Sequence, residues 1–287
     1  MQKLKLEELG LLPLSPSHLN RFVSDRAIWL MRKFFKLKSP YNINMLRGHA
    51  VEWGVEEGLK DKFKKIRHTT NDKGVIINHP VLSYYDKLVQ DNSFHGEQSI
   101  KLRIGLPEMV NAAITELNKY GKLISAQDWL KFNIDIVIDG ETYQIPFTGR
   151  TDFFMESEEF GRVLVDLKTT SRMPSTSVRY DTRLQQVLYS RATNFRTDLL
   201  YVGYGQVEKI IDGKKKKVMG PKTKIMNVEN DPKVLLRVQQ TIIAMEKLLR
   251  FSDDRNVLKE IILPNPDDFM SWKDDEAYQM RKEIWGW

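Results

Sequence analysis

The stretch GRTDFFMESEEFGRVLVDLKTT, from Gly149 to Thr170, is the most informative part of the sequence. Its two apolar runs, Phe153 to Met155 and Val163 to Val165, flank a short acidic segment, which predicts two neighbouring strands joined by a tight turn. Because side chains alternate along a strand, Asp166 and Lys168 are expected to point to the same side near the end of the second strand. A carboxylate beside an ammonium in that position suits the activation of a water molecule by a metal ion.

The tripeptide Asp-x-Lys is not specific by itself. It occurs again from Asp212 to Lys214 and from Asp231 to Lys233. The first of these falls on a glycine-containing turn beside a lysine run, and the second opens a helix, where Asp followed by Pro is common. Only Asp166 follows an apolar strand. The alternative for that position, an Asp and Lys pair on a solvated strand end, has to be weighed against the elements that flank it.

Composition limits the classes of protein and of site. With 287 residues, 41% of them hydrophobic, the chain can bury a full core. The absence of cysteine excludes disulfides, thiolate zinc sites, cysteine-held iron–sulfur clusters and cysteine nucleophiles, so a bound metal must use oxygen or imidazole ligands. No apolar run approaches the roughly 18 to 20 residues that span a bilayer, and the N-terminus has no signal-peptide pattern. We therefore expect a soluble cytoplasmic protein without a membrane partner.

The charge balance favours a polyanionic partner. The chain carries 45 Lys and Arg against 38 Asp and Glu, a net charge of +7. Cations that neutralise phosphates release counterions, so such an excess favours nucleic acid as the partner. The lysine run from Lys214 to Lys217 is nevertheless expected to be the solvated tip of a hairpin, with phosphate contact as the less favoured interpretation.

Residues 1–125 are predicted to be mainly helical. Ser15 and Pro16 have the residue types of a helix cap and first turn, and the apolar residues that follow extend this helix through Leu30. A second helix is expected from about Ile43 to Ile66, with Gly48 and Gly54 inside it indicating close backbone packing or a bend. Residues 68–80 are expected to form a loop, and residues 81–120 a helical region with one break at residues 105–107.

Residues 126–287 are predicted to hold the sheet and the remaining helices. Alternating apolar residues before Asp139-Gly140, a strong hairpin signal, mark the first strands. We expect an antiparallel meander, then a helix, a strand, a hairpin, a long helix and a polar tail that contains Trp, and we expect both parts of the chain to form one integrated domain. The expected bounds are Trp129 to Ile138, Glu141 to Pro146, Phe147 to Met155 and Arg162 to Lys168 for the meander, then Asp181 to Asn194, Leu199 to Val207 and Pro232 to Phe251.

The order of these elements resembles the PD-(D/E)XK nuclease superfamily, in its RecB-type and phage exonuclease branch. Five short pieces carry the resemblance: Ser15-Pro16-Ser17-x-Leu19, Gly48-x-x-x-Glu52, Gly149 to Phe153, Val165 to Thr170, and Gln185-x-x-x-Tyr189. The resemblance implies an α/β (α+β) fold with a restriction-endonuclease-like core. In such a core a mixed central sheet is flanked by helices in the order αβββαβ, here with extra N-terminal helices.

The resemblance also implies a metal centre and a catalytic lysine. Asp152, Asp166 and the carbonyl of Leu167 would hold Mg²⁺ or Mn²⁺, hard cations that prefer oxygen ligands. Lys168 would orient or help deprotonate the attacking water and offset charge in the transition state. Glu52 would be the acid contributed by a helix.

Other residues near these motifs are candidates for supporting roles. His49 could share a helix face with Glu52, but the spacing from Gly48 favours Glu52 as the ligand, and Glu56 is interpreted as a surface acid. Gln185 and Tyr189 lie four residues apart and can point at the same site, where the resemblance implies that they position the DNA strand and the active-site lysine or acid. A surface Gln beside a buried Tyr is the alternative. Arg150 and Arg183 flank the motifs and could contact phosphates.

The function implied is that of a Mg²⁺- or Mn²⁺-dependent deoxyribonuclease, expected to be an exonuclease in recombination, repair or phage DNA processing. DNA is the expected partner, with a recombinase or a single-strand-annealing protein as a further candidate, and oligomeric states from monomer to ring trimer stay open. If the chain is phage-encoded, it would act in the host cytoplasm. The lack of cysteine excludes the subtype that binds an iron–sulfur cluster.

Two alternative functions remain. A DNA-binding or scaffold subunit without activity is disfavoured by the complete set of acids and Lys168. A restriction-type endonuclease is disfavoured by the pair Gln185 and Tyr189. The direction of cleavage and the preference for single-stranded or double-stranded DNA, or for RNA, leave no pattern in the sequence.

Overall fold

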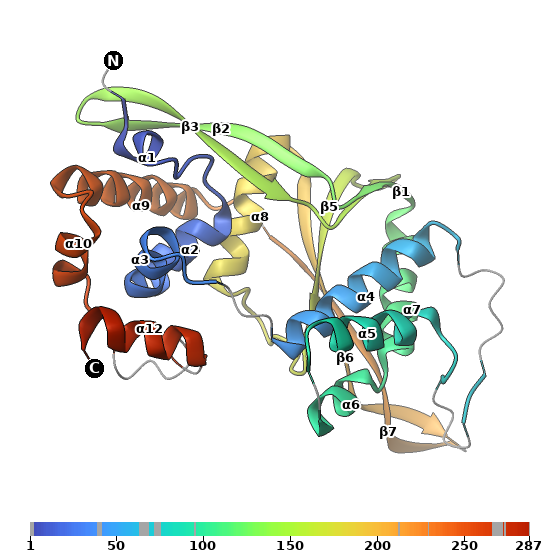
Figure 1. Ribbon diagram of the computed structural model, residues 1–287. Helices are drawn as coiled ribbons and strands as arrows, with labels where there is room; N and C mark the ends of the chain where they lie inside the picture. The colour runs from blue at the N-terminus through green and yellow to red at the C-terminus, as the bar shows by residue number, and fades with distance from the viewer. Residues whose placement is uncertain are drawn as a thin grey trace.

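A five-stranded mixed sheet forms the centre of the protein, and helices cover both of its faces (Figure 1). The computed structural model describes residues 3–38, 42–62, 69–71, 76–94, 96–211, 213–228, 230–265, 272 and 274–286. The strand order is β1–β4–β5–β6–β7. The bounds are β1 Lys122–Ala126, β4 Phe153–Ser157, β5 Gly161–Thr169, β6 Arg196–Ile211 and β7 Lys214–Asn227. The predicted fold class, a mixed sheet flanked by helices, is confirmed.

The connection between β5 and β6 produces the one parallel pairing among these strands. The helix α8 (Tyr180–Thr193) links them, and their register places Asp166 beside Leu199 and Lys168 beside Tyr201. The other neighbours in this sheet pair antiparallel. A parallel pair needs a crossover of a dozen or more residues, which is why a helix rather than a turn stands between the two strands.

The sheet separates two hydrophobic cores. In β5, Val163, Val165 and Leu167 face one core, whereas Leu164 faces the other, as strand alternation requires. The first core is formed with α4 (Ile43–Leu59), α5 (Pro80–Asp91) and α7 (Leu106–Leu117). The second is formed with the N-terminal helices, α8, the C-terminal helices and β2–β3. Asp166 and Lys168 therefore share the side of β5 on which α8 packs.

The N-terminal helices differ from the prediction at their ends. The helix expected from Ser15 through Leu30 is divided into α2 (Pro16–Ser24) and α3 (Arg26–Phe34), because Asp25 has an extended backbone and its side chain accepts from the Ile28 N–H at 3.0 Å. The next helix, α4, ends at Leu59, so the predicted end at Ile66 is wrong. Residues 63–68 and 72–75, which include residues 68 and 72–75 of the expected loop, lie outside the described residues.

The region predicted as helical with one break has two breaks. It contains α5, α6 (Glu97–Arg103) and α7, followed by the 3-10 turn η1 (Asn118–Tyr120). The break at Gly105 was expected, and the one that follows α5 was not. Among the helices in the described part of the chain, none is both long enough and apolar enough to cross a bilayer.

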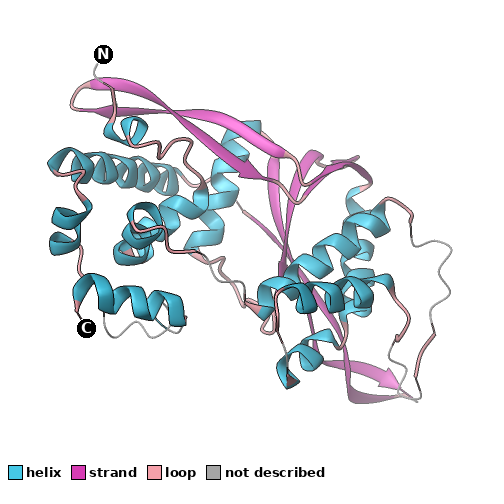
Figure 2. Cartoon of the chain, in the orientation of Figure 1, coloured by secondary structure: helices cyan, strands magenta, loops and turns pink. Residues whose placement is uncertain are grey.

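The predicted four-strand meander is confirmed for the antiparallel pairing of its first two strands and of its last two, and is wrong for the pairing between the second and the third. Strands β2 (Trp129–Ile138) and β3 (Glu141–Arg150) form a separate two-stranded sheet, drawn as the long hairpin in Figure 2. The strand β3 continues through Pro146, which was expected to end it. The carbonyl of Pro146 accepts from the Leu14 N–H at 2.9 Å, on the side away from β2, so the missing proline N–H removes no bond to β2. On the edge away from β5, β4 pairs with β1, a strand that the sequence did not reveal.

Later elements follow the prediction more closely. The helix α9 (Pro232–Phe251) has the expected bounds, with Asp231 as its cap and Pro232 in its first turn. The strand β6 is longer than expected, and the lysine run from Lys214 to Lys217 lies fully exposed on β7, next to the hairpin turn. The C-terminal segment adds α10 (Arg255–Ile261) and α12 (Asp275–Trp285).

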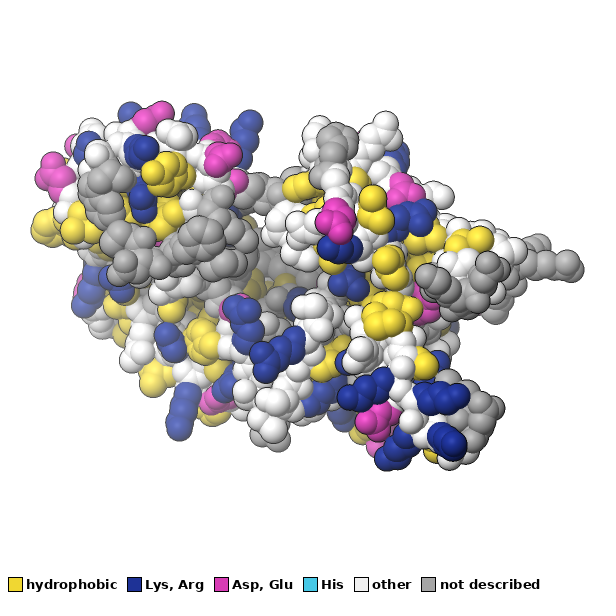
Figure 3. Space-filling view, turned by 90° about the horizontal axis from the view of Figure 1, so that it is seen from below, with side chains coloured by type: hydrophobic (Ala, Val, Ile, Leu, Met, Phe, Trp, Pro, Cys, Tyr) yellow, Lys and Arg dark blue, Asp and Glu magenta, His cyan; other side chains and the backbone are white. Residues whose placement is uncertain are grey.

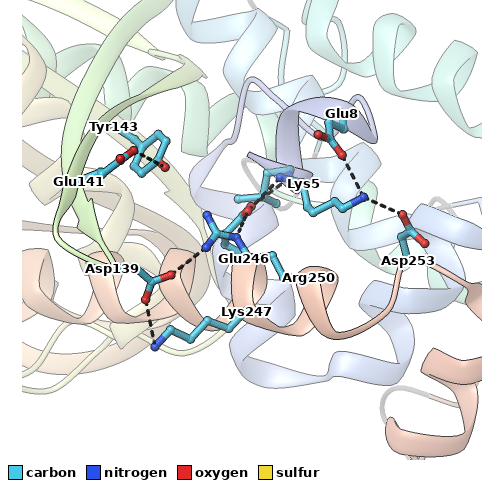
Figure 4. A network of polar contacts seen from close by, with 10 residues as sticks. Lys5, Glu8, Asp139, Glu141, Tyr143, Glu246, Lys247, Arg250 and Asp253 are labelled. Carbon is cyan, nitrogen blue, oxygen red and sulfur yellow. Dashed lines mark hydrogen bonds and ion pairs between the residues drawn. The ribbon is translucent and has the colours of Figure 1, made fainter. Parts of the chain in front are cut away.

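A buried carboxylate anchors the N-terminal segment to α9 (Figure 4). Glu246 has no exposed surface and accepts from the backbone N–H groups of Lys5 and Leu6 at 2.9 and 3.1 Å, at the start of α1 (Lys5–Glu8). Arg250 donates to Glu246 at 2.8 Å and to Asp139, in the β2–β3 turn, at 2.7 Å. Three segments that are distant in the sequence are therefore tied together at one side of the second core.

Candidate active site

The end of β5 carries a buried carboxylate and an ammonium in direct contact. Asp166 is 4% exposed, and its Oδ2 lies 2.5 Å from the Nζ of Lys168. Its other oxygen, Oδ1, accepts from the Nε2 of Gln185 on α8 at 3.0 Å. The juxtaposition that strand alternation suggested for the two β5 residues is therefore present, and α8 supplies a third member.

A second carboxylate joins this pair from the break between β3 and β4. The Oδ2 of Asp152 accepts from the backbone N–H of Leu167 at 2.8 Å, which ties its side chain to the middle of the Asp166-Leu167-Lys168 tripeptide. Gly149 to Asp152 can reach this position because the chain leaves β3 at Arg150 and enters β4 only at Phe153. The break that the sequence analysis did not place is thus what delivers Asp152 to β5.

Burial and neighbouring charges together shift the pKa values of Asp152 and Lys168. Burial raises the pKa of Asp152 well above its ordinary value, the nearby carboxylates of Asp166 and Glu52 raise it further, and Lys168 offsets part of the shift. Burial by itself would lower the pKa of Lys168, but the carboxylates of Asp166 and Asp152 outweigh it, so the pKa of Lys168 is raised. Lys168 is therefore a stable ammonium at neutral pH.

Glu52 reaches the same region from α4. It is half-buried, accepts a hydrogen bond from the side-chain amide of Gln127, and lines a cavity of about 400 Å³ together with Asp152 and Arg150. His49 and Glu56 line this cavity as well. Glu56 also pairs with Lys60, one turn further along α4. The helix spacing that favoured Glu52 thus agrees with its position beside Asp152, but His49 is not remote from the site.

Tyr189 holds the end of β3 in place. Its Oη accepts from the Arg150 N–H and donates to the Arg150 carbonyl, each at 3.1 Å, and the Gln185 amide lies 3.5 Å away. Tyr189 is 4% exposed, and burial raises its pKa to about 12. A Cβ on Gly149 would lie 2.4 Å from the Tyr189 ring, so the ring occupies space that only glycine leaves free. Gln185 and Tyr189 both point at the site, with Tyr189 contacting protein rather than solvent.

The two candidate phosphate-binding arginines lie in different places. Arg150 lines the cavity, and its Nε donates to the Gln127 carbonyl at 3.2 Å. Arg183 lies near the start of α8, where its guanidinium donates to the Val178 carbonyl at 3.1 Å and lies 3.7 Å from Asp231. The contacts of Arg183 therefore connect α8 to the start of α9 and do not involve the acids of the site.

Gln127 is a member of the site that the sequence analysis missed. Its side chain donates to Glu52, its backbone N–H donates to the Asp152 carbonyl at 3.0 Å, and its own carbonyl accepts from Arg150. Its φ of +61° is a left-handed conformation that costs a non-glycine residue about 1 to 3 kcal/mol. No local pattern marks this residue, because its role arises where the end of β1 meets α4.

Two aromatic residues of the cavity were missed as well. Trp53 follows Glu52 on α4, and Tyr84 lies on α5. Their rings are stacked, with centroids 4.3 Å apart and planes inclined by 14°. The available signal was the position of Trp53 directly after the expected metal ligand.

The donor chemistry of the site fits a hard divalent cation. Within the described residues, no three Asp, Glu or His side chains converge as a preformed metal cage. Asp166 Oδ2, however, is buried and contacts only the Lys168 ammonium among the described residues, and burial together with the nearby carboxylates of Asp166 and Glu52 raises the pKa of Asp152. A divalent cation would relieve both features through oxygen ligands, which Mg²⁺ and Mn²⁺ prefer.

The fold and this cluster of acids beside Asp-x-Lys define a class of nucleic-acid hydrolase. The chain belongs to the PD-(D/E)XK nuclease superfamily, whose family model matches residues 13–262. That range includes α4, both sheets and α8, and therefore every residue of the site described above. Membership supports nuclease activity.

Comparison with individual proteins adds more distant likenesses. No curated protein is significantly similar to the chain. Among solved structures, a "Putative exonuclease" from Eubacterium rectale is 12% identical, with 83% of this chain and 80% of that chain covered at a TM-score of 0.43. The structure of SSO0001 is also 12% identical, with coverages of 74% and 92% and a TM-score of 0.29.

Proposed function

We propose that this protein is a divalent-metal-dependent deoxyribonuclease that removes nucleotides from DNA ends. The observation that carries the proposal is the meeting of Asp152, Asp166 and Lys168 at the end of β5, beside Glu52 from α4. Superfamily membership supports the reaction class, and the excess of basic residues supports a polyanionic substrate. Basic side chains are spread over both sides of the face that Figure 3 shows.

In this proposal Glu52, Asp152, Asp166 and the Leu167 carbonyl hold Mg²⁺ or Mn²⁺. Such an ion, when bound, lowers the pKa of a bound water and stabilises charge on the phosphate. Because the pKa of Asp152 is raised, cation binding competes with its proton, and affinity for the metal should increase with pH.

Lys168 is assigned a charge-stabilising role. The raised pKa of its ammonium makes it a poor proton acceptor, so of the two roles considered for it we favour orientation of the water and stabilisation of negative charge. Its contact with Asp166 at 2.5 Å keeps that charge at the end of β5.

The remaining site residues are assigned two roles, which are to position other side chains of the site and to contact the DNA strand. Gln185 orients Asp166, and Tyr189 fixes the backbone of Arg150, whose guanidinium lines the cavity and could contact a phosphate. Arg183 is a weaker candidate for DNA contact, because its contacts are with α9 and the segment before α8.

The biological setting follows from the resemblance to the RecB-type and phage exonuclease branch. We place the activity in recombination, repair or phage DNA processing in the cytoplasm, with a recombinase or a single-strand-annealing protein as the candidate partner. A catalytically inactive DNA-binding subunit and a restriction-type endonuclease are the rival functions.

Digestion of end-labelled linear DNA and closed circular DNA, with Mg²⁺, Mn²⁺ or EDTA, tests the proposal. Asp166→Ala should abolish cleavage without unfolding the protein, whereas Asp135→Asn, at an exposed position of β2, should cut at the parent rate. Loss of linear DNA alone, only with metal, is the expected result. Discrete fragments from circular DNA would favour the endonuclease, and no cleavage by the parent would favour the DNA-binding subunit.

A further inference from the structure

The cavity beside the acids has an aromatic wall that the proposed chemistry does not use. Glu52, Asp152 and Arg150 line this space of about 400 Å³, and so do Trp53 and Tyr84. Glu52 and Trp53 are adjacent in α4, so the aromatic wall and the proposed metal ligand belong to the same turn of one helix. Because both residues line the same cavity, a ligand that fills it would contact both.

The stacked rings of Trp53 and Tyr84 are not needed to join α4 to α5. Those two helices already pack through fully buried residues, and a Cβ on Gly54 would lie 2.8 Å from Val110 and 3.2 Å from Val81, which shows how closely α4 approaches its neighbours. Trp53 and Tyr84 are only half-buried. The two rings stack on each other, and both residues line the polar cavity.

We infer that the cavity binds the base of an unpaired nucleotide next to the phosphate that is cleaved. Stacking on aromatic side chains accepts any base, since every base has a π face, and the Arg150 guanidinium can hold the adjoining phosphate. The volume lies within the range of sites for small molecules and is suited to a single nucleotide. Inside a duplex, neighbouring base pairs cover the faces of each base, so a base must leave the stack before it can enter.

This inference rests on the proposed nuclease function and narrows its substrate to single-stranded DNA or frayed ends. The aromatic wall supplies binding energy only to a strand whose bases are free, whereas the acids and Lys168 act on the phosphate of either form. Blunt duplex DNA should accordingly be a poorer substrate than a single strand of the same sequence.

Binding can be measured without cleavage by fluorescence anisotropy of a labelled oligothymidine in EDTA. Trp53→Leu and Tyr84→Leu keep apolar volume but remove the ring, and each should weaken binding roughly 5- to 150-fold, the effect of one base–aromatic stack. Tyr84→Phe keeps the ring and should bind as the parent does. Phe251→Leu removes an exposed ring at the end of α9 and should also bind normally.

Direct contact with the base is tested by a cycle of four affinities, in which the parent and Trp53→Leu each bind the oligothymidine and a fully abasic strand of the same length. The parent should lose a similar factor when the bases are removed, and Trp53→Leu should lose much less, because its stacking partner is already absent. Equal losses for both proteins, or parental binding by Trp53→Leu with a native melting curve, would overturn the inference.

Two features keep the test decisive. If one Leu variant fails to fold, the other variant and the comparison of thymidine with abasic strands on the parent still give the answer. Absence of cleavage with Mg²⁺ and Mn²⁺ would refute the proposed nuclease without touching the binding cycle. Intact cleavage with base-independent binding would refute only the inference about the cavity.

Discussion

Gly149→Ala should damage the site through a single added methyl group. An ideal Cβ at this position would lie 2.4 Å from both the Cε1 and the Oη of Tyr189, far inside van der Waals contact. Tyr189 is buried on α8, so its ring cannot swing into solvent, and moving it breaks the two hydrogen bonds to the Arg150 backbone. Overpacking costs about 1 to 3 kcal/mol and each lost hydrogen bond about 0.5 to 1.5 kcal/mol, so the free energy of unfolding should fall by about 2 to 6 kcal/mol.

Urea denaturation of matched variants measures this loss. Gly205→Ala on β6 is the control, because its Cβ would make only ordinary contacts, at 3.6 and 3.7 Å, with the end of the Lys222 side chain, and its cost should stay within about 0.5 kcal/mol. Tyr189→Phe should lose only the contribution of the hydroxyl. In a Tyr189→Ala background the ring is gone, so the added methyl at position 149 should cost much less than in the parent.

Two results would refute this account of the close approach. One is a Gly149→Ala protein that unfolds at the same urea concentration as the parent. The other is a cost for Gly149→Ala that is the same with and without the Tyr189 ring. The folded fraction of Gly149→Ala should also cleave DNA more slowly, since Arg150 and Gln185 both depend on the position of Tyr189.

Further variants test the other contacts of the site and the fold. Gln127→Gly should relieve the left-handed backbone and raise the free energy of unfolding by up to about 1 kcal/mol, and it should lower nuclease activity because Glu52 loses the amide that contacts it. The control is Lys36→Gly, at an exposed position with φ +60°, which should raise the free energy of unfolding without lowering activity. Asp152→Asn should abolish cleavage yet raise the melting temperature in EDTA at pH 8. The pKa of Asp152 in the folded protein lies above its ordinary value of 3.8, so the parent loses stability as the pH rises from 3.8 through the folded pKa. The gain in melting temperature of Asp152→Asn over the parent should therefore disappear near pH 4. Glu246→Ala leaves the buried N–H groups of Lys5 and Leu6 unpaired and should lower the free energy of unfolding by about 2 to 5 kcal/mol in urea, with the activity of the folded fraction unchanged.

Local signals were enough to predict several elements. The strand β5 has an apolar run that ends in Asp166 and Lys168, and α9 begins with Asp231 and Pro232, so short-range rules place both. Gly54 was expected to mark close packing, and its neighbours Val81 and Val110 are indeed within contact of an added Cβ. The division into residues 1–125 and 126–287 within one integrated domain stays a prediction.

Elements that depend on distant partners could not be predicted. The strand β1 is short and partly exposed, and it becomes a strand because β4, more than 25 residues later, offers it an edge. The stretch from Glu141 to Phe153 was predicted to hold the end of one strand at Pro146 and the start of the next at Phe147. In the structure the first of these strands continues to Arg150, so the boundary at Pro146 was wrong. The contact of Leu14 with β3, which makes Pro146 harmless, involves a segment more than 130 residues away.

The residues of the site also divide into those placed by local sequence signals and those placed by distant partners. Asp166 and Lys168 are set by strand alternation, which is a local property, whereas the orientation of Glu52 depends on Gln127, 75 residues further along the chain. The spacing from Gly48 selects Glu52, yet His49 lines the same cavity, so spacing alone cannot exclude it as a ligand. In the structure Glu52 accepts a hydrogen bond from the side-chain amide of Gln127, whose backbone N–H and carbonyl also hold Asp152 and Arg150, and the role of Glu52 as a metal ligand stays a prediction. The acid contributed by the helix is thus oriented by a strained residue that no sequence pattern identifies.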